Sequence, residues 1–539
     1  MPAAMMQRPL MTSDLMEFGI KDHPHAEIVT RKVEDGSIHR YTQLDASKRS
    51  KQLANALKKW GVHPGDRVAT LAWNTYRHYE AYFAVTGMGA VCHTVNPRLF
   101  PEQLDYIINH AEDRVIFADV NLLPLIDGLQ SKLGTVELVV AMCDESDLPD
   151  HTIDQLVCYE QFISGHSDEF EWPELDEDSN CSLCYTSGTT GNPKGVMYTH
   201  RSTVLHAVYS LHAQAFNLSC DNAVLPVVPM FHVNCWGIPY AVAITGAKLI
   251  FPGAAMDGAS LWELIEKEQP DLLAGVPTVW LGLLNHLDSI NAKMDSVNTV
   301  VIGGSAAPRS MIEAFDKKHD AFVMHAWGMT EMSPIGTVNA NTAYLRSLPE
   351  NERYTLQQKQ GRPVFGVDLK IIDDEGNEQP RDGKAYGRLM VRGPWIIDTY
   401  YKADKSALED GWFDTGDVAT IDPQNFMQIV DRSKDVIKSG GEWISSIDLE
   451  NAAVGHPDVA EACVIGIPHE KWQERPLLIC VLKDGATADK QSVLDYLEPQ
   501  LAKFWMPDDV VFRDELPHTA TGKLLKVPLR EEYNEHYLK

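Results

Sequence analysis

The segment YTSGTTGNPKGV, residues 185–196, combines the side chains that a protein uses to hold an anion. Its three glycines permit unusual backbone angles and let main-chain N–H groups approach a ligand closely. Four hydroxyl side chains add donors, and Lys194 adds positive charge. Lys194 lies between Pro193 and Gly195, so the segment is not a Walker A loop, where Gly-Lys-Ser/Thr follows four other residues. A polar surface turn is the alternative, but hydroxyls interleaved with glycines and closed by Pro-Lys-Gly favour a phosphate-binding loop.

The 539-residue chain is strongly acidic, with a net charge of −29. Nucleic acid and anionic lipid both need a cationic face, so this charge argues against either partner. The N-terminus is rich in methionine but lacks the apolar run of a signal peptide. No stretch has the length of a membrane-spanning helix. We therefore expect a cytoplasmic protein without membrane insertion, in which any anion site is a local exception to the charge.

The nine cysteines do not form a pattern typical of a disulfide framework. Cys181 and Cys184 form a lone C-x-x-C, with no second Cys/His pair nearby and no helix start after the first cysteine. A zinc or redox role needs one of these features. We therefore expect both cysteines to be core residues of a strand that leads into the 185–196 loop.

The elements that must position this loop are short apolar strands alternating with helices. From about 40 to 430 the runs DRVIFAD, TVELVVAM, GAKLIFPG and TVVIGGS are β-branched and bounded by turns, which is typical of an α/β fold with a parallel sheet. Between 365 and 430 the pattern changes to hairpin strands, which predicts a small antiparallel, barrel-like subdomain. Residues 435–539 indicate a compact α+β unit with a helix over 490–503. A boundary at 431–434 would separate a large N-terminal α/β domain from this small C-terminal one.

Six further segments accompany the loop, and together they resemble a known family. They are VPMFHVNCWG (228–237), GGSAAP (303–308), WGMTE (327–331), WFDTGD (412–417), DRSKDVIKSGGEWIS (431–445) and TATGKLLK (519–526). Their order and nearly full-length spread are similar to the adenylate-forming superfamily of acyl- and aryl-CoA ligases, peptide-synthetase adenylation domains and luciferases. Within it, the chain most resembles bacterial fatty-acyl-CoA synthetases and methylmercaptopropionate-CoA ligases.

The resemblance implies a two-step reaction with ATP, Mg²⁺ and coenzyme A. A carboxylate attacks the α-phosphorus of ATP to give acyl-AMP and pyrophosphate, and the CoA thiol then displaces AMP. It also implies an N-terminal adenylation domain at 1–431, a hinge at 432–434 and a mobile C-terminal domain at 435–539, which carries the catalytic lysine.

The resemblance assigns the ATP-binding residues by motif. The phosphates would be held by Thr186, Ser187, Gly188, Thr189, Thr190, Gly191 and Lys194. The adenosine would contact Gly304, Ser305, Ala306, Trp327, Gly328, Met329, Asp417 and Arg432. Trp327 replaces the more common tyrosine and keeps the π-face for adenine, whereas a core position is its alternative. Asp417 would accept from the ribose hydroxyls, and an Asx-type turn is its alternative.

The catalytic set implied by the family is Lys523, Glu331, Thr330, Lys434 and His232. Glu331 would hold Mg²⁺, a hard cation that prefers oxygen ligands. Lys523 would bridge the substrate carboxylate and the α-phosphate, and Lys434 would be the hinge residue. A lone histidine on an apolar segment is otherwise a core residue, which is the alternative for His232.

The acyl and CoA sites complete the prediction. The acyl pocket would include His232, Trp236, Val276, Gly303 and Gly304, and CoA would contact Lys438, Ser439, Gly440, Gly441, Glu442, Trp443 and Glu474. Gln473 replaces a family glycine beside Glu474, which weakens that assignment, and packing between domains is the alternative for Trp443. The acyl motifs carry no charge for a second polar group, so we expect an aliphatic acid: methylmercaptopropionate or a short- or medium-chain fatty acid.

Three rival functions share this scaffold. They are a medium- or long-chain fatty acid ligase, a stand-alone enzyme that loads a carrier-protein thiol, and a luciferase-like oxidative second step. A catalytically inactive binding protein would be expected to lose Lys523, Glu331 or the phosphate loop, and all three are present. The subgroup resemblance further implies a homodimer.

Overall fold

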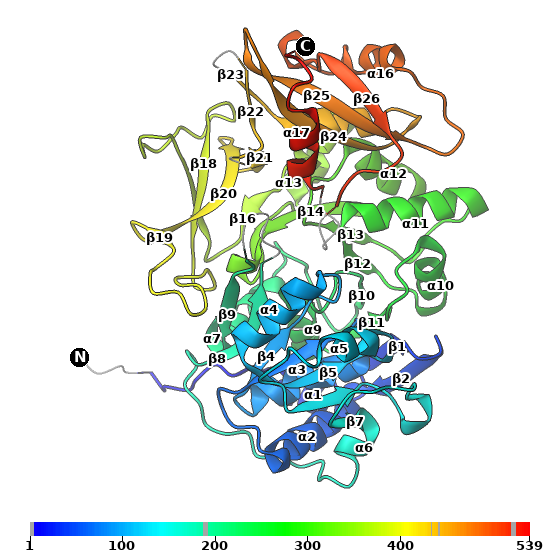
Figure 1. The fold of residues 1–539 in the computed structure, drawn as a ribbon, viewed down its shortest axis with the longest axis vertical. Coiled ribbons are helices and arrows are strands. Elements are labelled where there is room, and N and C mark those ends of the chain that lie inside the picture. Colours follow the sequence, from blue (N-terminus) through cyan, green and yellow to red (C-terminus); the bar gives the residue numbers. More distant parts are fainter. Residues whose placement is uncertain (1–4, 187–191, 433, 440–441, 519–523, 539) are drawn as a thin grey trace. The chain divides into compact units, whose positions relative to one another are not determined.

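The computed structural model describes residues 5–186, 192–432, 434–439, 442–518 and 524–538. The chain packs into two compact units (Figure 1). Unit 1 comprises Met1–Val301, Gly328–Gly336 and Pro394–Ala407, and unit 2 comprises Ile302–Trp327, Thr337–Gly393 and Leu408–Lys539. This division does not coincide with the domain boundary expected at 431–434, which stays a prediction. No described helix is long and apolar enough to cross a membrane.

A seven-stranded sheet forms half of unit 1, in the order β7-β6-β5-β3-β4-β8-β9. Its strands are β3 (Arg67–Leu71), β4 (Val91–Thr94), β5 (Asp113–Ala118), β6 (Leu138–Ala141), β7 (Leu156–Cys158), β8 (Asn180–Tyr185) and β9 (Gly195–Thr199). All neighbours pair in parallel except β8 and β9. Helix α2 (Gln43–Trp60) precedes β3, and the helices that follow strands of this sheet are α3 (Tyr76–Gly87), α4 (Pro101–Ala111), α5 (Leu123–Leu129), α6 (Tyr159–Ile163) and α7 (His200–Ser210). Helix-covered parallel strands are buried on both faces, which explains their continuous apolar sequences.

The other strands of unit 1 run in the order β13-β12-β10-β11-β1-β2. They are β1 (Glu27–Arg31), β2 (Ile38–Thr42), β10 (Ala223–Pro226), β11 (Lys248–Phe251), β12 (Leu272–Gly275) and β13 (Thr299–Ile302). The accompanying helices are α1 (Thr12–Asp22), α9 (Ile238–Thr245), α10 (Gly258–Glu268) and α11 (Pro277–Ile290). The four strands expected at DRVIFAD, TVELVVAM, GAKLIFPG and TVVIGGS are therefore confirmed as β5, β6, β11 and β13, and the α/β class is confirmed with them.

Unit 2 begins with α12 (Arg309–His319) and strands in the order β16-β15-β14. These are β14 (Phe322–Gly328), β15 (Ile335–Val338) and β16 (Arg362–Pro363), with helices α13 (Ala343–Ser347) and α14 (Glu350–Gln357) between the last two. The antiparallel sheet expected at 365–430 is confirmed, in the order β17-β18-β20-β19 with β21 on β20. Its strands are β17 (Asp368–Ile372), β18 (Tyr386–Arg392), β19 (Leu408–Glu409), β20 (Trp412–Ile421) and β21 (Met427–Arg432).

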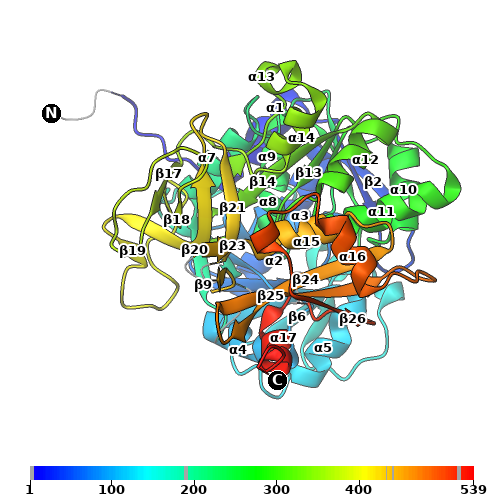
Figure 2. The ribbon, with the colours of Figure 1, turned by 90° about the horizontal axis from the view of Figure 1, so that it is seen from above.

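The C-terminal part of unit 2 is the expected α+β arrangement. Its sheet runs β23-β22-β25-β24, with β26 beside β25. The strands are β22 (Ile437–Ser439), β23 (Glu442–Ile444), β24 (Val459–His469), β25 (Gln473–Leu482) and β26 (Asp509–Arg513), and the helices are α15 (Ser446–Val454), α16 (Lys490–Leu497) and α17 (Lys526–Tyr533). Figure 2 shows α15 and α16 beside these strands, and Leu449 and Val493 anchor them in one apolar core.

The helix predicted over 490–503 was too long, because α16 ends at Leu497. Pro499 follows two residues later. A proline lacks the N–H that would continue the helix.

The structure confirms that Cys181 and Cys184 are buried residues of β8 with free thiols. Residues three apart point to opposite faces of a strand. Accordingly Cys181 contacts Thr203, whereas Cys184 contacts Thr94 at 3.1 Å. The two thiols cannot share a metal in this arrangement.

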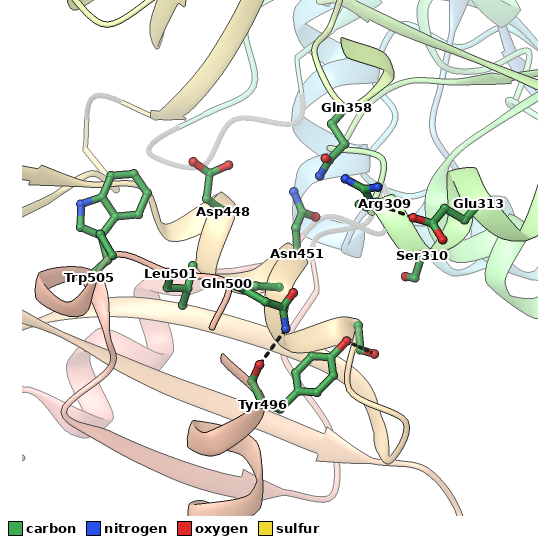
Figure 3. A pocket seen from close by; sticks show the side chains of 13 residues that line it. Arg309, Ser310, Glu313, Gln358, Asp448, Asn451, Tyr496, Gln500, Leu501 and Trp505 are labelled. Carbon is green, nitrogen blue, oxygen red and sulfur yellow. Dashed lines mark hydrogen bonds and ion pairs between the residues drawn. The ribbon is translucent and has the colours of Figure 1, made fainter. Parts of the chain in front are cut away.

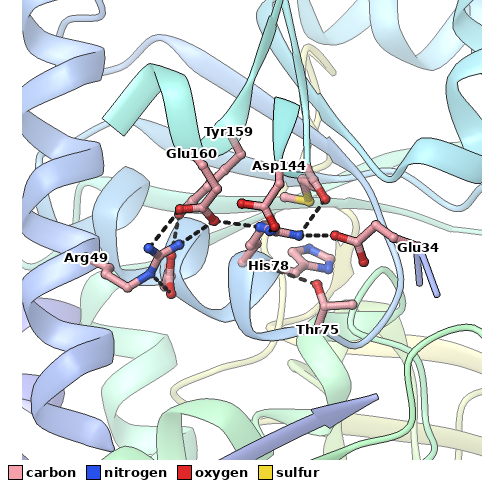
Figure 4. A network of polar contacts seen from close by, with 10 residues as sticks. Glu34, Arg49, Thr75, His78, Asp144, Tyr159 and Glu160 are labelled. Carbon is pink, nitrogen blue, oxygen red and sulfur yellow. Dashed lines mark hydrogen bonds and ion pairs between the residues drawn. The ribbon is translucent and has the colours of Figure 1, made fainter. Parts of the chain in front are cut away.

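A buried network of charges lies beside this sheet in unit 1 (Figure 4). Arg49 binds Glu80 and Glu160, and Arg77 binds Glu160, Glu34 and the carbonyl of Met142. Buried charges are tolerated only when paired in this way. The network therefore fixes α2, α3 and α6 against one another.

Candidate active site

The ends of the phosphate loop lie on the β8–β9 hairpin. Residues 187–191, with the predicted ligands Ser187, Gly188, Thr189, Thr190 and Gly191, lie outside the described residues. The hairpin closes tightly at the base of the loop, where Thr186 N donates to Lys194 O at 2.9 Å and Lys194 N donates to Thr186 Oγ1 at 3.2 Å. The Lys194 side chain is exposed. The hairpin thus presents one cation beside the loop.

Thr330 and Glu331 lie in a short turn after β14 in unit 1, and both are buried. The turn is held by its main chain: Tyr198 Oη donates to Thr330 O at 2.6 Å, and Ile397 N donates to Glu331 O at 2.9 Å. Tyr400 Oη donates to Glu331 Oε1 at 2.8 Å. The ring of Tyr400 also lies 4.7 Å from Lys194 Nζ. The structure therefore brings together the predicted phosphate cation and the predicted metal carboxylate around a tyrosine that sequence reasoning missed.

Glu331 suits a magnesium ion that is shared with a substrate. No group of three or more His, Cys, Asp or Glu residues forms a metal site among the described residues. Mg²⁺ commonly keeps several waters and binds through one or two carboxylates plus substrate phosphates, without a protein cage. Tyr400 occupies only Oε1 of Glu331, and no described residue donates a hydrogen bond to Oε2. The residues therefore fit a metal that arrives with the nucleotide.

In unit 2 the predicted ribose acceptor Asp417 is already hydrogen-bonded. Trp327 Nε1 donates to Asp417 Oδ2 at 3.0 Å, and Arg432 Nε lies 2.8 Å from Asp417 Oδ1. Asp417 and Arg432 are direct partners on β20 and β21. An Asx-type turn was the alternative for Asp417. Asp414 forms this turn instead, because its carboxylate accepts from Gly416 N at 2.9 Å. The structure thus joins three of the predicted adenosine residues in one cluster.

The other predicted adenosine residues lie on two stretches of the chain. Gly304, Ser305 and Ala306 follow β13, and Gly304 takes a positive φ of 81° that glycine permits. Gly304 and Ser305 are exposed, whereas Gly303 is buried. Gly328 and Met329 continue the chain from Trp327 toward Thr330. A Cβ on Gly328 would meet Pro334 O at 2.0 Å, so this close turn requires glycine.

The predicted acyl motif contains a left-handed backbone turn that sequence reasoning missed. Residues Val233, Asn234, Cys235 and Trp236, the element α8 (Val233–Trp236), have φ angles between 47° and 57°, and Gly237 has 74°. Left-handed conformation costs roughly 1–2 kcal/mol per non-glycine residue, so four in succession need compensation. Strain of this kind is common at ligand sites. Only Gly237 gave a signal for it in the sequence.

Hydrogen bonds from neighbouring strands hold this turn and the loop before it. Asn74 Nδ2 donates to Val228 O at 2.9 Å, and Asn74 Oδ1 accepts from Met230 N at 2.7 Å. Asn234 Nδ2 donates to Ser182 Oγ at 2.9 Å. Trp236 is buried and His232 is half-buried.

Val276 lies close to this motif through the sheet. Val228 N donates to Ala274 O at 3.0 Å, and Val276 is the residue before α11. The pairing of β10 with β12 thus places Val276 two residues after the partner of Val228, which begins the motif, and its place in the acyl pocket stays a prediction.

Arg98 is a second residue that sequence reasoning missed. Its guanidinium lies 5.6 Å from the ring centroid of Trp73 and 5.9 Å from that of Phe231, in the acyl motif. Its nearest polar side-chain partner is Met256 Sδ at 3.9 Å, and no described carboxylate pairs with it. In a chain of net charge −29, this exposed cation is suited to an anionic ligand.

On the predicted CoA side, Lys438 and Ser439 lie on β22, and Glu442 and Trp443 pair with them from β23. Gly440, Gly441 and Lys523, the predicted catalytic lysine, lie outside the described residues. Glu474 Oε2 accepts from Lys438 N at 2.9 Å, so this carboxylate supports the β22 backbone. Lys438 and Lys434, the predicted hinge residue, both have exposed side chains.

A cavity of 570 Å³ lies in unit 2 between residues of α12, α15 and α16 (Figure 3). Arg309 and Glu313 on its wall form an ion pair at 2.7 Å. None of the predicted site residues lines it, so the cavity adds no member to the candidate site.

Comparison with known proteins identifies the class. The family model AMP-binding enzyme matches residues 18–401, and the AMP-binding enzyme C-terminal domain matches residues 448–523. The chain therefore belongs to the AMP-binding enzyme family, which confirms the class that the seven motifs indicated.

Particular relatives cover the whole length of the chain. It is 49% identical over 532 residues to a 3-methylmercaptopropionyl-CoA ligase of Ruegeria lacuscaerulensis, covering 98% of each chain. It is 48% identical over 536 residues to a medium-chain-fatty-acid–CoA ligase of Ectopseudomonas oleovorans, covering 99% of this chain and 98% of that one. The crystal structure of the anthranilate CoA ligase AuaEII in complex with anthranoyl-AMP matches with a TM-score of 0.87 over 99% of both chains. At 24% identity, this last match shows the fold alone.

Proposed function

We propose that the chain is an AMP-forming acyl-CoA ligase that acts on an aliphatic carboxylic acid. The observation that carries the proposal is the meeting of Lys194 and Glu331 around Tyr400, at the base of a glycine- and hydroxyl-rich loop. A cation for phosphates and a carboxylate for a phosphate-bound metal are what phosphoryl chemistry on ATP needs. The named relatives of similar length support the same class of reaction.

In the first step an oxygen of the substrate carboxylate attacks the α-phosphorus of ATP. The bond from that phosphorus to the bridging oxygen breaks, and pyrophosphate leaves with the electron pair. Lys194 and the loop hydroxyls hold the terminal phosphates, and Thr330 lies at the α-phosphate. Magnesium, held by Glu331, neutralises phosphate charge when it is bound. Trp327 and Asp417 hold adenine and ribose.

In the second step the CoA sulfur attacks the acyl carbonyl of acyl-AMP, and AMP leaves. The loop from Lys438 to Trp443 lines the path of CoA, after a rotation about Lys434 within the 432–434 hinge. Lys523 bridges the substrate carboxylate and the α-phosphate in the first step only. Lys523→Ala is therefore expected to abolish acyl-AMP formation while it still converts supplied acyl-AMP to acyl-CoA; equal loss of both half-reactions would contradict this role.

The acid is proposed to be 3-methylmercaptopropionate or a short- or medium-chain fatty acid. The turn around Trp236 is buried and uncharged, and the motif itself offers no charge for a second carboxylate or an ammonium. An apolar pocket separates acids by only about 1–3 kcal/mol per methylene, so neighbouring chain lengths should show graded activity. A long-chain acid and a carrier-protein thiol as acceptor are the competing possibilities.

The proposal is tested by identifying the nucleotide product that forms when the protein is incubated with Mg-ATP, CoA and each acid of a panel. The panel runs from acetate to palmitate and includes 3-methylmercaptopropionate. AMP that depends on both acid and CoA is the expected result, and the acid with the highest kcat/KM identifies the substrate. AMP without CoA dependence would indicate another acceptor, and ADP would contradict the proposal.

The proposal includes three properties of the whole protein. The enzyme is cytoplasmic, it forms a homodimer, and its mobile C-terminal domain begins after the 432–434 hinge. Mass photometry at nanomolar concentration would count the protomers directly.

A further inference from the structure

The segment around Tyr400 lies directly on the base of the phosphate loop. Tyr401 N donates to Gly195 O at 2.8 Å, and a Cβ added to Gly195 would meet Tyr401 Cβ at 3.0 Å. Only glycine at the end of the Pro-Lys-Gly sequence therefore lets the two backbones approach this closely. The next residue, Lys402, extends the contact by binding Glu112 at 2.7 Å.

The same segment also holds the turn that carries the metal carboxylate. Ile397 N donates to Glu331 O at 2.9 Å, and Trp395 Nε1 donates to Ile335 O at 3.0 Å, just after that turn. Residues 395–402 thus bind the Glu331 turn at one end and the loop base at the other. Tyr400 is the residue of this segment whose side chain reaches both functional groups.

The hydroxyl and the ring of Tyr400 contact groups of opposite charge. Its hydroxyl donates to Glu331 Oε1 at 2.8 Å, and its ring lies 4.7 Å from Lys194 Nζ, within cation–π range. Since the hydroxyl fixes one oxygen of Glu331, the other is left in a defined direction.

The geometry points to Tyr400 as a positioning residue that sets Glu331 for the metal and Lys194 for the phosphates of one nucleotide. This inference rests on the proposed function, because it takes Glu331 as the metal carboxylate and Lys194 as the phosphate cation. It assigns each half of the side chain a separate task. The hydroxyl governs the part of nucleotide binding that needs Mg²⁺, and the ring governs the part that does not.

Equilibrium binding of ATP, measured by titration calorimetry with excess Mg²⁺ or with excess EDTA, separates the two tasks. Tyr400→Phe keeps the ring and loses the hydroxyl, so we expect about tenfold weaker binding of MgATP, as for a lost hydrogen bond to a charged group. Binding of ATP in EDTA should be unchanged. Tyr400→Leu also removes the ring, and it should weaken ATP binding in EDTA by about two- to fivefold.

Tyr401→Phe is the matched control, because it removes a hydroxyl from the neighbouring residue. That hydroxyl makes only a 3.5 Å contact with Ala111 O and touches neither Lys194 nor Glu331. Tyr401→Phe should change neither binding constant. Thermal unfolding of the two Tyr400 variants and of Tyr401→Phe checks that the fold is retained. Equal weakening with and without Mg²⁺ in Tyr400→Phe, or none at all, would overturn the inference.

Glu331→Gln separates failure of this inference from failure of the proposed function. If Glu331→Gln leaves the effect of Mg²⁺ on ATP binding intact, Glu331 is not the metal carboxylate and this inference falls with that role, whereas the nucleotide-product test still decides the proposed function. If Glu331→Gln removes that effect and Tyr400→Phe does not reduce it, only the role of Tyr400 is wrong. In the double variant, Tyr400→Phe should cause no further loss, since its target is already gone; fully additive losses would also overturn the inference.

Discussion

The indole of Trp327 donates its N–H to the carboxylate of Asp417 at 3.0 Å. The more common tyrosine at position 327 would present an aromatic face of similar kind but has no ring N–H to donate. Arg432 binds the other oxygen of Asp417, so the carboxylate is held from two sides. Trp327 therefore fixes the group proposed to meet the ribose, in addition to the flat face that it is proposed to offer to adenine.

Trp327→Phe tests this second contribution. The phenyl ring keeps the π-face, whereas the hydrogen bond to Asp417 is lost. We expect AMP to bind about three- to tenfold more weakly, because a hydrogen bond to a charged group contributes more than a neutral one. The Kd for AMP from titration calorimetry is the measurement. Trp412→Phe is the control: Trp412 begins the same strand as Asp417, and its ring faces Lys370 and Arg392. Equal Kd values for both variants would refute the role.

The strands and the motifs could be predicted because their signals are local. β5 and β11 are continuous apolar runs bounded by turns, and a buried parallel strand needs nothing further to be recognised. Tyr400 gave no such signal, because its partner Glu331 lies 69 positions away and Tyr400 itself is not unusual in its own segment. Asn74 and Met230 are separated by 156 positions for the same reason. A single sequence indicates which side chains could react. The residues that orient those side chains can be identified only in the folded structure.

The left-handed turn in the acyl motif was unpredictable for a different reason. β-Branched residues such as Val233 avoid positive φ, so their presence argues against the conformation that the chain adopts. The cost is offset by contacts that are distant in sequence, such as Asn234 with Ser182. Local preference and tertiary packing disagree here, which is typical of functional sites.

Gly237→Ala is expected to destabilise the fold and disturb the acyl motif. At φ 74° an added Cβ would meet His206 Nδ1 at 2.6 Å, and His206 Nε2 accepts from Ile335 N at 3.2 Å. Left-handed strain and a steric clash together should cost about 2–5 kcal/mol in the free energy of unfolding. Gly36→Ala is the matched control, because Gly36 has φ 72° and no atom within 4 Å of an added Cβ. It should cost only the strain, about 1–2 kcal/mol. Urea unfolding measures both, and equal losses would show that the His206 contact is irrelevant.

Arg98→Met tests the cation beside the acyl motif. Methionine keeps much of the packing against Trp73 and Phe231 but removes the charge that no described carboxylate balances. We expect the KM of one anionic substrate, ATP, the acid or CoA, to rise about tenfold, with little change in the unfolding temperature. Measuring each KM in turn identifies the ligand. Arg201→Met is the control, because Arg201 pairs with Glu177 at 3.3 Å. Three unchanged KM values for Arg98→Met would mean that its charge is not used.

Asp119 links stability to pH in a direction opposite to that of most carboxylates. It is 2% exposed, and burial raises its pKa to about 7, with a further contribution from the charge of Glu34. Because the folded pKa lies above the unfolded one, the protonated carboxyl stabilises the fold fully below about pH 4, and this contribution is lost as the pH rises to 7. His78 and His206 have their pKa values lowered by burial to about 4 and about 3, and they act in the opposite sense, weakening the fold below about pH 6.

The variant Asp119→Asn separates the effect of the Asp119 carboxyl on stability from that of His78 and His206. Asp119→Asn keeps an oxygen that can accept from Trp73 N, which now donates to Asp119 at 2.7 Å, but it cannot ionise. The free energy of unfolding of the variant, relative to the natural chain, should therefore increase by a few kcal/mol between pH 4 and pH 7. Urea unfolding at four pH values measures the difference. Asp221→Asn, at an exposed carboxylate, is the control for the loss of one negative charge. A constant difference for Asp119→Asn would mean that Asp119 is already ionised in the folded protein.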